Sequence, residues 1–528
     1  MKILLTVSHQ KNKPGKLLLF LIALFLQLSL FAQPATSLPR SNPEAEGVSS
    51  KEIIQFLDAI SESNHEFHSF MILRHGKVVA EGWWKPYEAN LKHTMYSVSK
   101  SFTATAVGFA VAEKRISVND KVISFFPADL PDTVSTYLSE LRIKDLLSMS
   151  VGQTPDPTGD IGGKNDNWIK AFFNTPILSQ PGSKFLYNSA ATYMLSAIVQ
   201  KVTGERILNY LQPRLFDPLG ITGIDWEVSP QKINSGGWGL RLKTEDMAKF
   251  GQLFLQKGNW KGKQVLPRSW VEEASTMKIE QDPTATQARK DSSDWLQGYC
   301  YQMWRSRNSA YRADGAFGQF IIVLPEKDAV VVITSETTNM QGEFNLVWKY
   351  LLPAFKPGKI AADPTALSQL KKKTSSLTLP MVVSTPSPME SKISGKPLKI
   401  VENENNSGNV SFQFQNGVCK LTVNNDSAQY SLSFGSGKWV MGETRKLGPS
   451  LTARLRGNRS ELSTYKIAGS YHWKTENTLE LTLRYIESPH TETIRCVFDG
   501  SNVQIEFINS FNKAVSTTFK AALPVNVP

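Results

Sequence analysis

Two hairpin patterns far apart in the chain constrain its fold more than any other feature. Residues 70–84 (FMILRHGKVVAEGWW) alternate around a turn at His75-Gly76, and residues 318–335 (GQFIIVLPEKDAVVVITS) alternate around a turn at 325–328. Both runs are rich in β-branched and aromatic residues, which favour strands. The stretches between them have helical spacing. We therefore predict an α+β fold in which the two ends of this region share one antiparallel sheet.

Two of the helical stretches are well delimited. Residues 189–204 (SAATYMLSAIVQKVTG) gather apolar side chains on one face and end at Gly204, while residues 244–258 begin at Thr244 and end at Gly258. Glycine just after the last periodic residue is a common helix terminus. The region from 39 to 355 is thus predicted to mix strands at its ends with helices in its middle.

The composition changes after this region. Residues 356–388 collect prolines, serines and a lysine run, which predicts a linker with at most one helical turn. Beyond it, short runs alternate around turns at Asn416-Gly417 and Asp499-Gly500, which are typical of tight hairpins. We predict a separate antiparallel β domain over residues 389–528.

The first 32 residues have the pattern of a secretory signal peptide. Lysines up to Lys16 precede the apolar run 17–32, which is short for a membrane span of roughly 20 residues. Cleavage near Ala32 would export the protein to a periplasm or the medium. An uncleaved membrane anchor is the alternative. No other stretch is apolar for long enough to span a membrane, so we expect no stable span after cleavage.

The charge does not indicate a nucleic-acid partner. The formal net charge is +12, of which four charges belong to lysines of the leading segment, and the remainder is spread along the chain. No run alternates arginines with aromatic residues. A solvated basic surface explains this charge.

The three cysteines are too few for a disulfide scaffold, and none has the C-x-x-C spacing of metal or redox sites. They are Cys300, Cys419 and Cys496. Cys419 and Cys496 each lie in a strand-like run and each is expected to face a core. They either pair in an oxidising compartment or remain two buried thiols.

Residues 95–110 (MYSVSKSFTATAVGFA) place Ser97 and Lys100 at the start of a stretch that is almost free of charge. Residues three apart share a helix face, so the amine is expected beside the hydroxyl. A helix N-terminus stabilises a developing alkoxide, and desolvation favours a neutral lysine that can take the serine proton. The alternative is that Ser97 caps the helix and Lys100 extends to solvent.

The histidines exclude the commonest alternatives. The seven histidines are His9, His65, His68, His75, His93, His472 and His490. Residues 94–471 contain none, and no G-x-S-x-G motif is present, so a Ser-His-Asp triad is disfavoured. His65 and His68 suggest a loop before a strand rather than a metal-binding pair. A hydrolase with this sequence would use lysine as its base and would need no metal or organic cofactor.

The order of the later motifs resembles a known family. The segments are SVSKSFTATAVGFAVAEKRISVNDKVISFFP, IKDLLSMSVG, FLYNSAATYMLSAIVQKVTG, GGWGLRLKTEDMAKFGQLFLQKGNWKGKQVLP and ADGAFGQFIIVLPEKDAVVVITS. Over about residues 43–335 they resemble the serine β-lactamases and penicillin-recognising hydrolases. The branch is that of class C β-lactamases, family VIII esterases, D-aminopeptidases and 6-aminohexanoate-dimer hydrolases. The resemblance implies an antiparallel sheet flanked by helices, with an all-helical subdomain.

The same resemblance implies roles for individual residues. Ser97 would be the acylated nucleophile, Lys100 its base partner and Tyr187 the tyrosine of the Y-x-N motif, which relays a proton to the leaving group. The backbone N–H groups of Ser97 and Ala316 would form the oxyanion hole. For Tyr187, a packed aromatic residue before a helix is the alternative.

Two motifs depart from the family. Ser189 occupies the asparagine position of Tyr187-Asn188-Ser189, and the third motif is Ala313-Asp314-Gly315, which lacks the usual cation. Arg312 is adjacent, but alternation along a strand would turn it away. Asn188, Ser189, Asp314 and Gly315 remain the candidate substrate contacts. The missing cation favours an esterase or amidase acting on a less anionic substrate over a β-lactamase or DD-peptidase.

Two hypotheses follow for the function. The first is a secreted serine hydrolase that cleaves an ester or amide of a small molecule or short oligomer through an acyl-enzyme on Ser97. The second is a non-catalytic cell-envelope binding or sensing protein that retains the fold. The intact Ser97, Lys100 and Tyr187 set favours the first.

Overall fold

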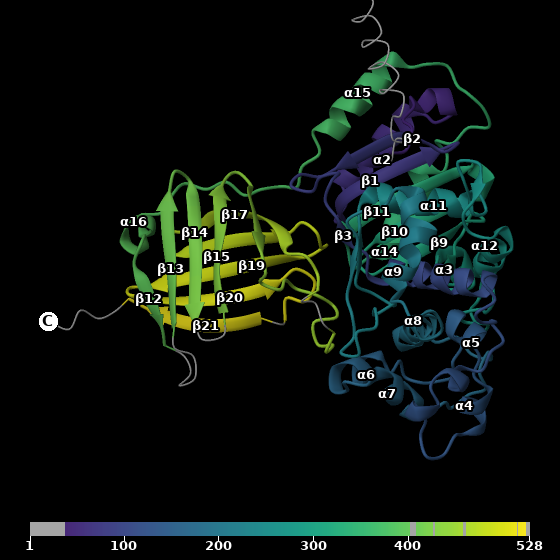
Figure 1. The fold of residues 1–528 in the computed structure, drawn as a ribbon. Helices are drawn as coiled ribbons and strands as arrows, with labels where there is room; N and C mark the ends of the chain where they lie inside the picture. Colours follow the sequence, from purple (N-terminus) through teal and green to yellow (C-terminus); the bar gives the residue numbers. More distant parts are fainter. Residues whose placement is uncertain (1–36, 402–407, 426–427, 458–460, 515, 524–528) are drawn as a thin grey trace, which may run out of the picture.

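The protein folds into two bodies joined by a long connection, as a computed structural model shows (Figure 1). The structure describes residues 37–401, 408–425, 428–457, 461–514 and 516–523. The signal peptide predicted for residues 1–32 therefore lies outside the described residues. Within the described part of the chain, no helix has the length and apolar character needed to cross a membrane.

The two predicted hairpins meet in one six-stranded sheet with the order β2-β1-β11-β10-β9-β8. Its strands are β1 (Glu66–Arg74), β2 (Lys77–Trp83), β8 (Trp304–Arg305), β9 (Tyr311–Gly315), β10 (Gln319–Leu324) and β11 (Ala329–Glu336). Strands β1 and β11 pair antiparallel along their whole length, from Glu66 opposite Glu336 to Arg74 opposite Ala329. The ends of the α+β region share one sheet, which confirms the prediction.

Helices cover both faces of this sheet, which explains the nearly continuous apolar runs in its central strands. Phe70 and Ile72 of β1 face one core, and Met71 and Leu73 face the other. On the first face lie α2 (Ser50–Ser61), α14 (Met340–Leu346) and the π-helical η7 (Val347–Leu351). On the second lie α3 (Ser99–Ala112) and α11 (Thr244–Leu255).

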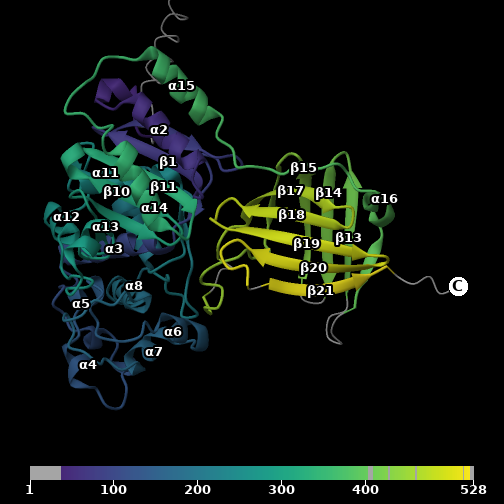
Figure 2. The same ribbon diagram turned by 180° about the vertical axis from the view of Figure 1, so that it is seen from behind.

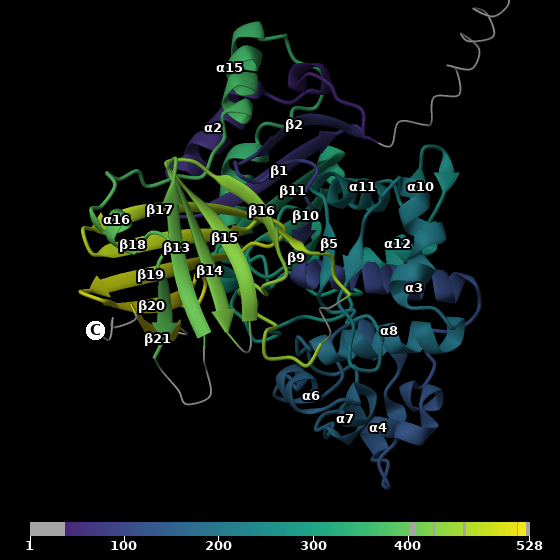
Figure 3. The same ribbon diagram turned by 60° about the vertical axis from the view of Figure 1, so that its left-hand side comes forward.

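A helical subdomain lies beyond α3 on the second face (Figures 1 and 3). It contains α4 (Thr136–Glu140), α5 (Ile143–Leu147), α6 (Thr158–Lys164), α7 (Trp168–Asn174), α8 (Ser189–Thr203) and α9 (Ile207–Leu211), whereas α10 (Asp217–Leu219) lies beside α11. Helix α8 ends at Gly204, whose φ of 77° is a left-handed conformation that glycine adopts without strain. The predicted helices at 189–204 and 244–258 are confirmed, although α11 ends three residues before Gly258.

Short elements complete the α+β region. They are η1 (Pro43–Glu46), η2 (Tyr96–Val98), η3 (Val122–Phe125), η4 (Pro127–Asp129), η5 (Gln212–Phe216), η6 (Pro325–Lys327), α12 (Arg268–Ser275), α13 (Gln287–Ser292), β3 (His93–Thr94), β4 (Asp225–Trp226), β5 (Leu240–Leu242), β6 (Asn259–Trp260) and β7 (Lys263–Gln264).

The predicted linker holds more structure than the single turn expected from its composition. Residues 364–375 form α15 (Pro364–Ser375), which begins after an Asp363 cap and packs on α2 and β2. Ala366 and Leu370, four residues apart, are buried against the α+β region, and Lys373 of the lysine run pairs with Asp58 of α2. Proline at the first helical position and an apolar face docked on the α+β region stabilise α15, which the proline- and serine-rich composition of the segment did not indicate.

The C-terminal residues form a closed antiparallel sheet, as Figure 2 shows from behind. It contains β12 (Pro397–Ile400), β13 (Gly408–Gln415), β14 (Val418–Asn425), β15 (Ala428–Ser436), β16 (Val440–Thr444), β17 (Tyr465–Thr475), β18 (Thr478–Tyr485), β19 (Thr491–Asp499), β20 (Asn502–Asn509) and β21 (Ser516–Ala522), with α16 (Met389–Ile393) at one end. A short parallel pairing of β15 with β17 closes the sheet on itself. The predicted turns at Asn416-Gly417 and Asp499-Gly500 are confirmed. We call this body the closed β domain.

The thiols of Cys419 on β14 and Cys496 on β19 are buried in the core of the closed β domain. Both are free, as is Cys300 in the α+β region. The structure therefore corresponds to the alternative of unpaired thiols, and burial raises the pKa of each of them.

Candidate active site

Ser97 lies on η2, a single 3-10 turn that leads directly into α3. Residues 99–110 of α3 are all buried, and the helix runs between the sheet and α8 (Figure 3). The start of α3 carries no side-chain capping bond, so Ser97 does not cap the helix. Its side chain remains partly exposed, in contrast to the helix that follows.

Lys100 points into the protein and not to solvent. Its side chain is 1% exposed, and Nζ lies 3.0 Å from Ser97 Oγ, 2.9 Å from Ser189 Oγ and 2.8 Å from the Gly237 carbonyl oxygen. A neutral amine can donate to the carbonyl while its lone pair faces the Ser97 hydroxyl. The alternative in which Ser97 caps the helix and Lys100 extends to solvent is therefore wrong.

Burial lowers the pKa of Lys100 from 10.5 to about 7, because the charged ammonium loses its hydration. The carboxylates of Asp156 and Asp314 oppose this effect from a distance. Near neutral pH a large fraction of Lys100 is thus uncharged and able to act as a base. An ordinary surface lysine would be protonated at this pH.

The rate at which Ser97 is acylated should therefore depend on pH. We expect the second-order rate of modification by a fluorophosphonate to rise as the pH increases through about 7 and to level off above it, because only neutral Lys100 accepts the proton. Intact-mass spectrometry at timed intervals measures this rate. A rate that is independent of pH across this range would contradict the role of Lys100.

Tyr187 lies directly before α8 and completes the cluster. Its ring stacks on Trp304 with centroids 5.4 Å apart, and the Lys100 Nζ lies 4.8 Å from the centre of the Tyr187 ring. Burial raises the pKa of Tyr187 well above its ordinary value, and a hydrogen bond with Ser97 opposes this shift. The phenol is therefore neutral, which makes it a proton donor while Lys100 is the better base. Tyr187 thus packs against Trp304 and also contacts both Ser97 and Lys100.

The end of β9 lies close against the turn that carries Ser97. Gly315, the last residue of β9, leaves no room for a side chain, because a Cβ atom there would be 2.3 Å from the Met95 carbonyl oxygen. This close approach brings Ala316, the next residue, beside η2. The oxyanion hole expected from the main-chain N–H groups of Ser97 and Ala316 stays a prediction, with which this close approach is compatible.

We predict that Gly315→Ala lowers kcat by about 100-fold, because the added methyl group pushes β9 away from η2 and misplaces Ala316. Ester turnover at saturating substrate measures the effect. Gly358→Ala is the matched control, since a Cβ atom at Gly358 meets nothing within 4 Å. Equal turnover of the two variants would show that the spacing between β9 and η2 is unimportant.

Three of the four expected substrate contacts have another partner inside the protein. Ser189, expected to face a substrate amide, holds the Lys100 amine. Asn188 is 1% exposed, its Oδ1 accepts from the Ala191 N–H at 3.1 Å, and its Nδ2 donates to Gln153 at 2.8 Å. Asn188 therefore caps α8, and its contact with substrate stays a prediction.

Asp314 is occupied by a neighbouring arginine. Arg312 and Asp314 share one face of β9, away from Ala313, and Arg312 Nε donates to Asp314 Oδ2 at 2.9 Å with both side chains buried. Burial raises the pKa of Asp314, and Arg312 counteracts the rise. The charges of Arg312 and Asp314 are thus paired with each other within the protein. Arg312 is therefore not available to bind a substrate carboxylate, which agrees with the predicted preference for a less anionic substrate.

Some residues of the site carried no recognisable signal in the sequence. The Gly237 carbonyl, which accepts from Lys100, lies in a glycine-rich segment where the local pattern does not distinguish one carbonyl from another. Trp304, which stacks on Tyr187, lies in the two-residue strand β8 with no motif around it. Among the described residues, no group of three or more His, Cys, Asp or Glu side chains could hold a metal ion.

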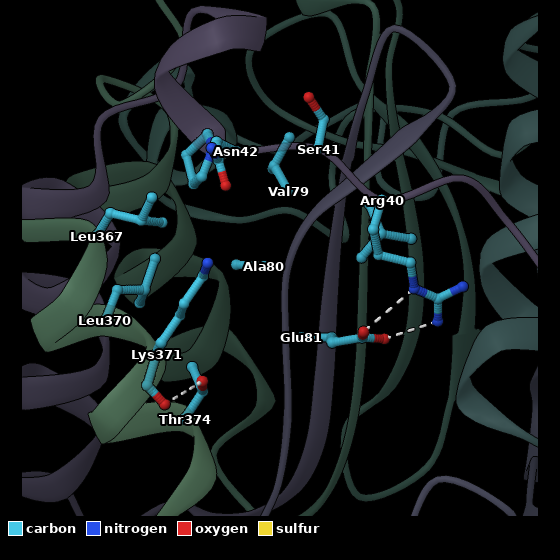
Figure 4. A pocket seen from close by; sticks show the side chains of 12 residues that line it. Arg40, Ser41, Asn42, Val79, Ala80, Glu81, Leu367, Leu370, Lys371 and Thr374 are labelled. Carbon is cyan, nitrogen blue, oxygen red and sulfur yellow. Dashed lines mark hydrogen bonds and ion pairs between the residues drawn. The ribbon is translucent and has the colours of Figure 1, made fainter. Parts of the chain in front are cut away.

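A second hollow lies away from this cluster, at the outer edge of the sheet. It has a volume of about 560 Å³ and is bounded by β2, α15 and residues 40–43 (Figure 4). An ion pair between Arg40 and Glu81 forms one side, and the Lys371 side chain reaches in from α15. Neither Ser97 nor Lys100 lines this hollow, so it is not the candidate active site.

The α+β region is similar in sequence to known proteins. The model of the family described as Beta-lactamase matches residues 67–354. The chain is 27% identical over 286 residues to a 6-aminohexanoate-dimer hydrolase of Paenarthrobacter ureafaciens, a match that covers 50% of this chain and 71% of that protein.

More distant similarities extend the comparison. The chain is 25% identical over 234 residues to an Escherichia coli (strain K12) protein described as "Putative D-alanyl-D-alanine carboxypeptidase", covering 39% of this chain but only 54% of that protein. A solved structure, the octameric penicillin-binding protein homologue from Pyrococcus abyssi, is 15% identical. It covers 89% of this chain and 99% of its own, with a TM-score of 0.47.

Proposed function

Because the chain belongs to the β-lactamase family, we propose that it is a serine hydrolase that cleaves an ester or amide bond through a covalent acyl-enzyme on Ser97. The observation that supports this most directly is the buried Lys100 amine, 3.0 Å from the Ser97 hydroxyl and with its pKa lowered to about 7. A strongly lowered pKa beside a nucleophile is typical of a functional site.

The proposed reaction proceeds in two halves. Neutral Lys100 takes the proton of Ser97, and Oγ attacks the substrate carbonyl carbon. The oxyanion accepts hydrogen bonds from the N–H groups of Ser97 and Ala316. When the bond to the leaving group breaks, the proton passes from Lys100 through Tyr187 to the departing oxygen or nitrogen. Water then attacks the acyl-enzyme with the same groups acting in reverse order.

The substrate class follows from the charges around Ser97. The Arg312–Asp314 ion pair stands beside the position where relatives with K-T-G carry a cation, so we propose a small molecule or short oligomer without a carboxylate near the scissile bond. The similarity to a 6-aminohexanoate-dimer hydrolase supports an amide as one candidate bond. The carboxypeptidase similarity covers little more than half of that relative and gives weaker support for an anionic peptide.

We also propose that the protein is exported, on the evidence of the lysine-rich and apolar residues 1–32. N-terminal sequencing of protein recovered from a periplasmic fraction or the medium tests this. A new N-terminus near Gln33 is the expected result, whereas an intact Met1 in a membrane fraction would support the anchor.

Intact-mass spectrometry tests the proposed function. Wild-type protein is incubated separately with a fluorophosphonate, a short-chain p-nitrophenyl ester and penicillin. We expect one fluorophosphonate adduct per chain and turnover of the ester, with slower or absent acylation by penicillin. Folded protein that forms no adduct with any probe would overturn the hydrolase and support the binding or sensing protein instead.

A further inference from the structure

The two proposed oxyanion donors are each next to a residue in an unfavourable backbone conformation. Tyr96, which precedes Ser97, has a φ of 45°, and Phe317, which follows Ala316, has a φ of 65°. Residues with a side chain rarely adopt this left-handed region, and they stay there only when surrounding contacts hold them. Whatever holds Tyr96 therefore also sets the direction of the Ser97 N–H, which belongs to the peptide unit between these two residues. Whatever holds Phe317 limits how far the adjacent Ala316 can move.

One side chain of the closed β domain contacts both of these residues. His490, in the loop between β18 and β19, is fully buried. Its Nε2 lies 2.5 Å from the Tyr96 hydroxyl, and its ring meets the Phe317 ring edge-on at 4.8 Å between centroids. The closed β domain thus reaches the residues on either side of the proposed oxyanion hole, although it shares no strand with the α+β region.

His490 is itself held in one orientation. Its Nδ1 lies 2.6 Å from Glu336 Oε1, which also accepts from the Ser510 hydroxyl at 2.5 Å. A nitrogen facing a carboxylate carries the proton, so Nδ1–H donates to Glu336 and Nε2 accepts from the Tyr96 hydroxyl. Phe511 packs against the rings of both His490 and Phe317, at 4.4 and 5.1 Å. The chain of contacts runs without a break from β11 through His490 to Tyr96.

We propose that His490 is a positioning residue that keeps the N–H groups of Ser97 and Ala316 aimed at the oxyanion. This inference rests on the proposed function. The closed β domain is accordingly part of the catalytic unit. Without the acceptor at His490 Nε2, the Tyr96 hydroxyl loses a buried partner, although it still accepts from the Leu451 N–H at 3.3 Å, and the left-handed backbone of Tyr96 is held less firmly.

Tyr96→Phe tests this with the smallest change, since it removes one hydroxyl and keeps the ring. Tyr87→Phe is the matched control, because the Tyr87 hydroxyl donates to the Ser488 carbonyl of the same loop at 3.2 Å without contacting the nucleophile turn. We expect Tyr96→Phe to lower kcat for a p-nitrophenyl ester by about 10- to 100-fold with KM little changed, and Tyr87→Phe to leave both near the wild-type values.

A double-mutant cycle tests whether the two side chains act together. It adds His490→Gln and the Tyr96→Phe/His490→Gln double variant. If the two side chains act through one hydrogen bond, the double variant should lose no more kcat than the more damaging single variant. Inhibition by phenylboronic acid, whose adduct with Ser97 places an oxygen in the oxyanion hole, should weaken in parallel with kcat. A purely structural contact would lower the melting temperature without this pattern.

The outcomes separate this inference from the proposed function. Suppose that wild-type protein turns over and that Tyr96→Phe and His490→Gln both behave like Tyr87→Phe. This result would overturn the role of His490 and leave the proposed hydrolase function intact. Wild-type protein that neither turns over nor reacts with the fluorophosphonate would overturn both. A loss of kcat in Tyr96→Phe that adds fully to that of His490→Gln would also contradict the shared hydrogen bond.

Discussion

Replacing Ser97 with alanine is expected to lower kcat by at least about 10⁴-fold and to abolish covalent modification by a fluorophosphonate, because the variant has no atom that can form the acyl-enzyme. Substrate binding should survive, since the substitution removes one partly exposed hydroxyl and leaves the neighbouring side chains unchanged. Ester turnover and intact-mass spectrometry on the same preparation measure both effects.

Ser101→Ala is the control for Ser97→Ala. Ser101 is one helical turn further along, and its buried hydroxyl donates to the Gln302 carbonyl at 2.8 Å. Its loss should cost about 1 kcal/mol of stability and little activity. If Ser97→Ala kept wild-type turnover, or if the fluorophosphonate adduct persisted on it, another residue would be the nucleophile.

Lys100→Met should have the second largest effect, a loss of about 10²- to 10⁴-fold in kcat, because no other side chain within reach of Ser97 Oγ is a neutral base near pH 7 among the residues that the structure describes. Methionine fills the space of the lysine stem but accepts no proton. The pH dependence expected for wild-type acylation should disappear together with the rate.

Lys249→Met provides a matched control for Lys100→Met. Lys249 is also buried, on α11, where Nζ donates to the Gly220 carbonyl at 3.0 Å and lies 3.5 Å from Asp246. Its replacement should lower stability, by leaving Asp246 without its partner, yet preserve kcat. A Lys249 variant as inactive as the Lys100 variant would indicate a general loss of structure.

Lys100 should also make the stability of the protein depend on pH. The pKa of Lys100 is about 7 in the folded protein and 10.5 in the unfolded chain, so between these values the unfolded chain binds more protons at this site. Lys100 therefore reduces the free energy of unfolding as the pH falls from 10.5 to 7. Lys100→Met should remove this pH dependence, which denaturant titrations at several pH values can measure.

Local patterns in the sequence were sufficient for the elements and for the centre of the site. The alternation around His75-Gly76 and around residues 325–328 located two hairpins, because period-two patterning depends only on neighbouring residues. The spacing of Ser97 and Lys100 before an uncharged stretch predicted a buried helix with both groups at its start. A serine and a lysine three residues apart need only a helical turn to meet.

Patterns of this kind failed where a side chain had two possible uses. Asn188 stands beside the motif tyrosine, but its amide caps α8 and bonds to Gln153. The composition of residues 356–388 suggested a linker, while the buried Ala366 and Leu370 dock a full helix on α2. The cap contact of Asn188 with Ala191 is local, but its bond to Gln153 and the docking of α15 on α2 involve distant segments, which local composition does not reveal.

The amino-acid sequence by itself determined the two hairpins of the sheet, the helices at 189–204 and 244–258, the order of the two bodies and the pairing of Ser97 with Lys100, since each of these depends on residues close together in the chain. Only the tertiary structure decided which groups surround that pair. Tyr96 and His490 are 394 residues apart and belong to different bodies. Their contact exists because the closed β domain docks against the nucleophile turn, and docking depends on the shapes and charges of whole surfaces rather than on any local pattern.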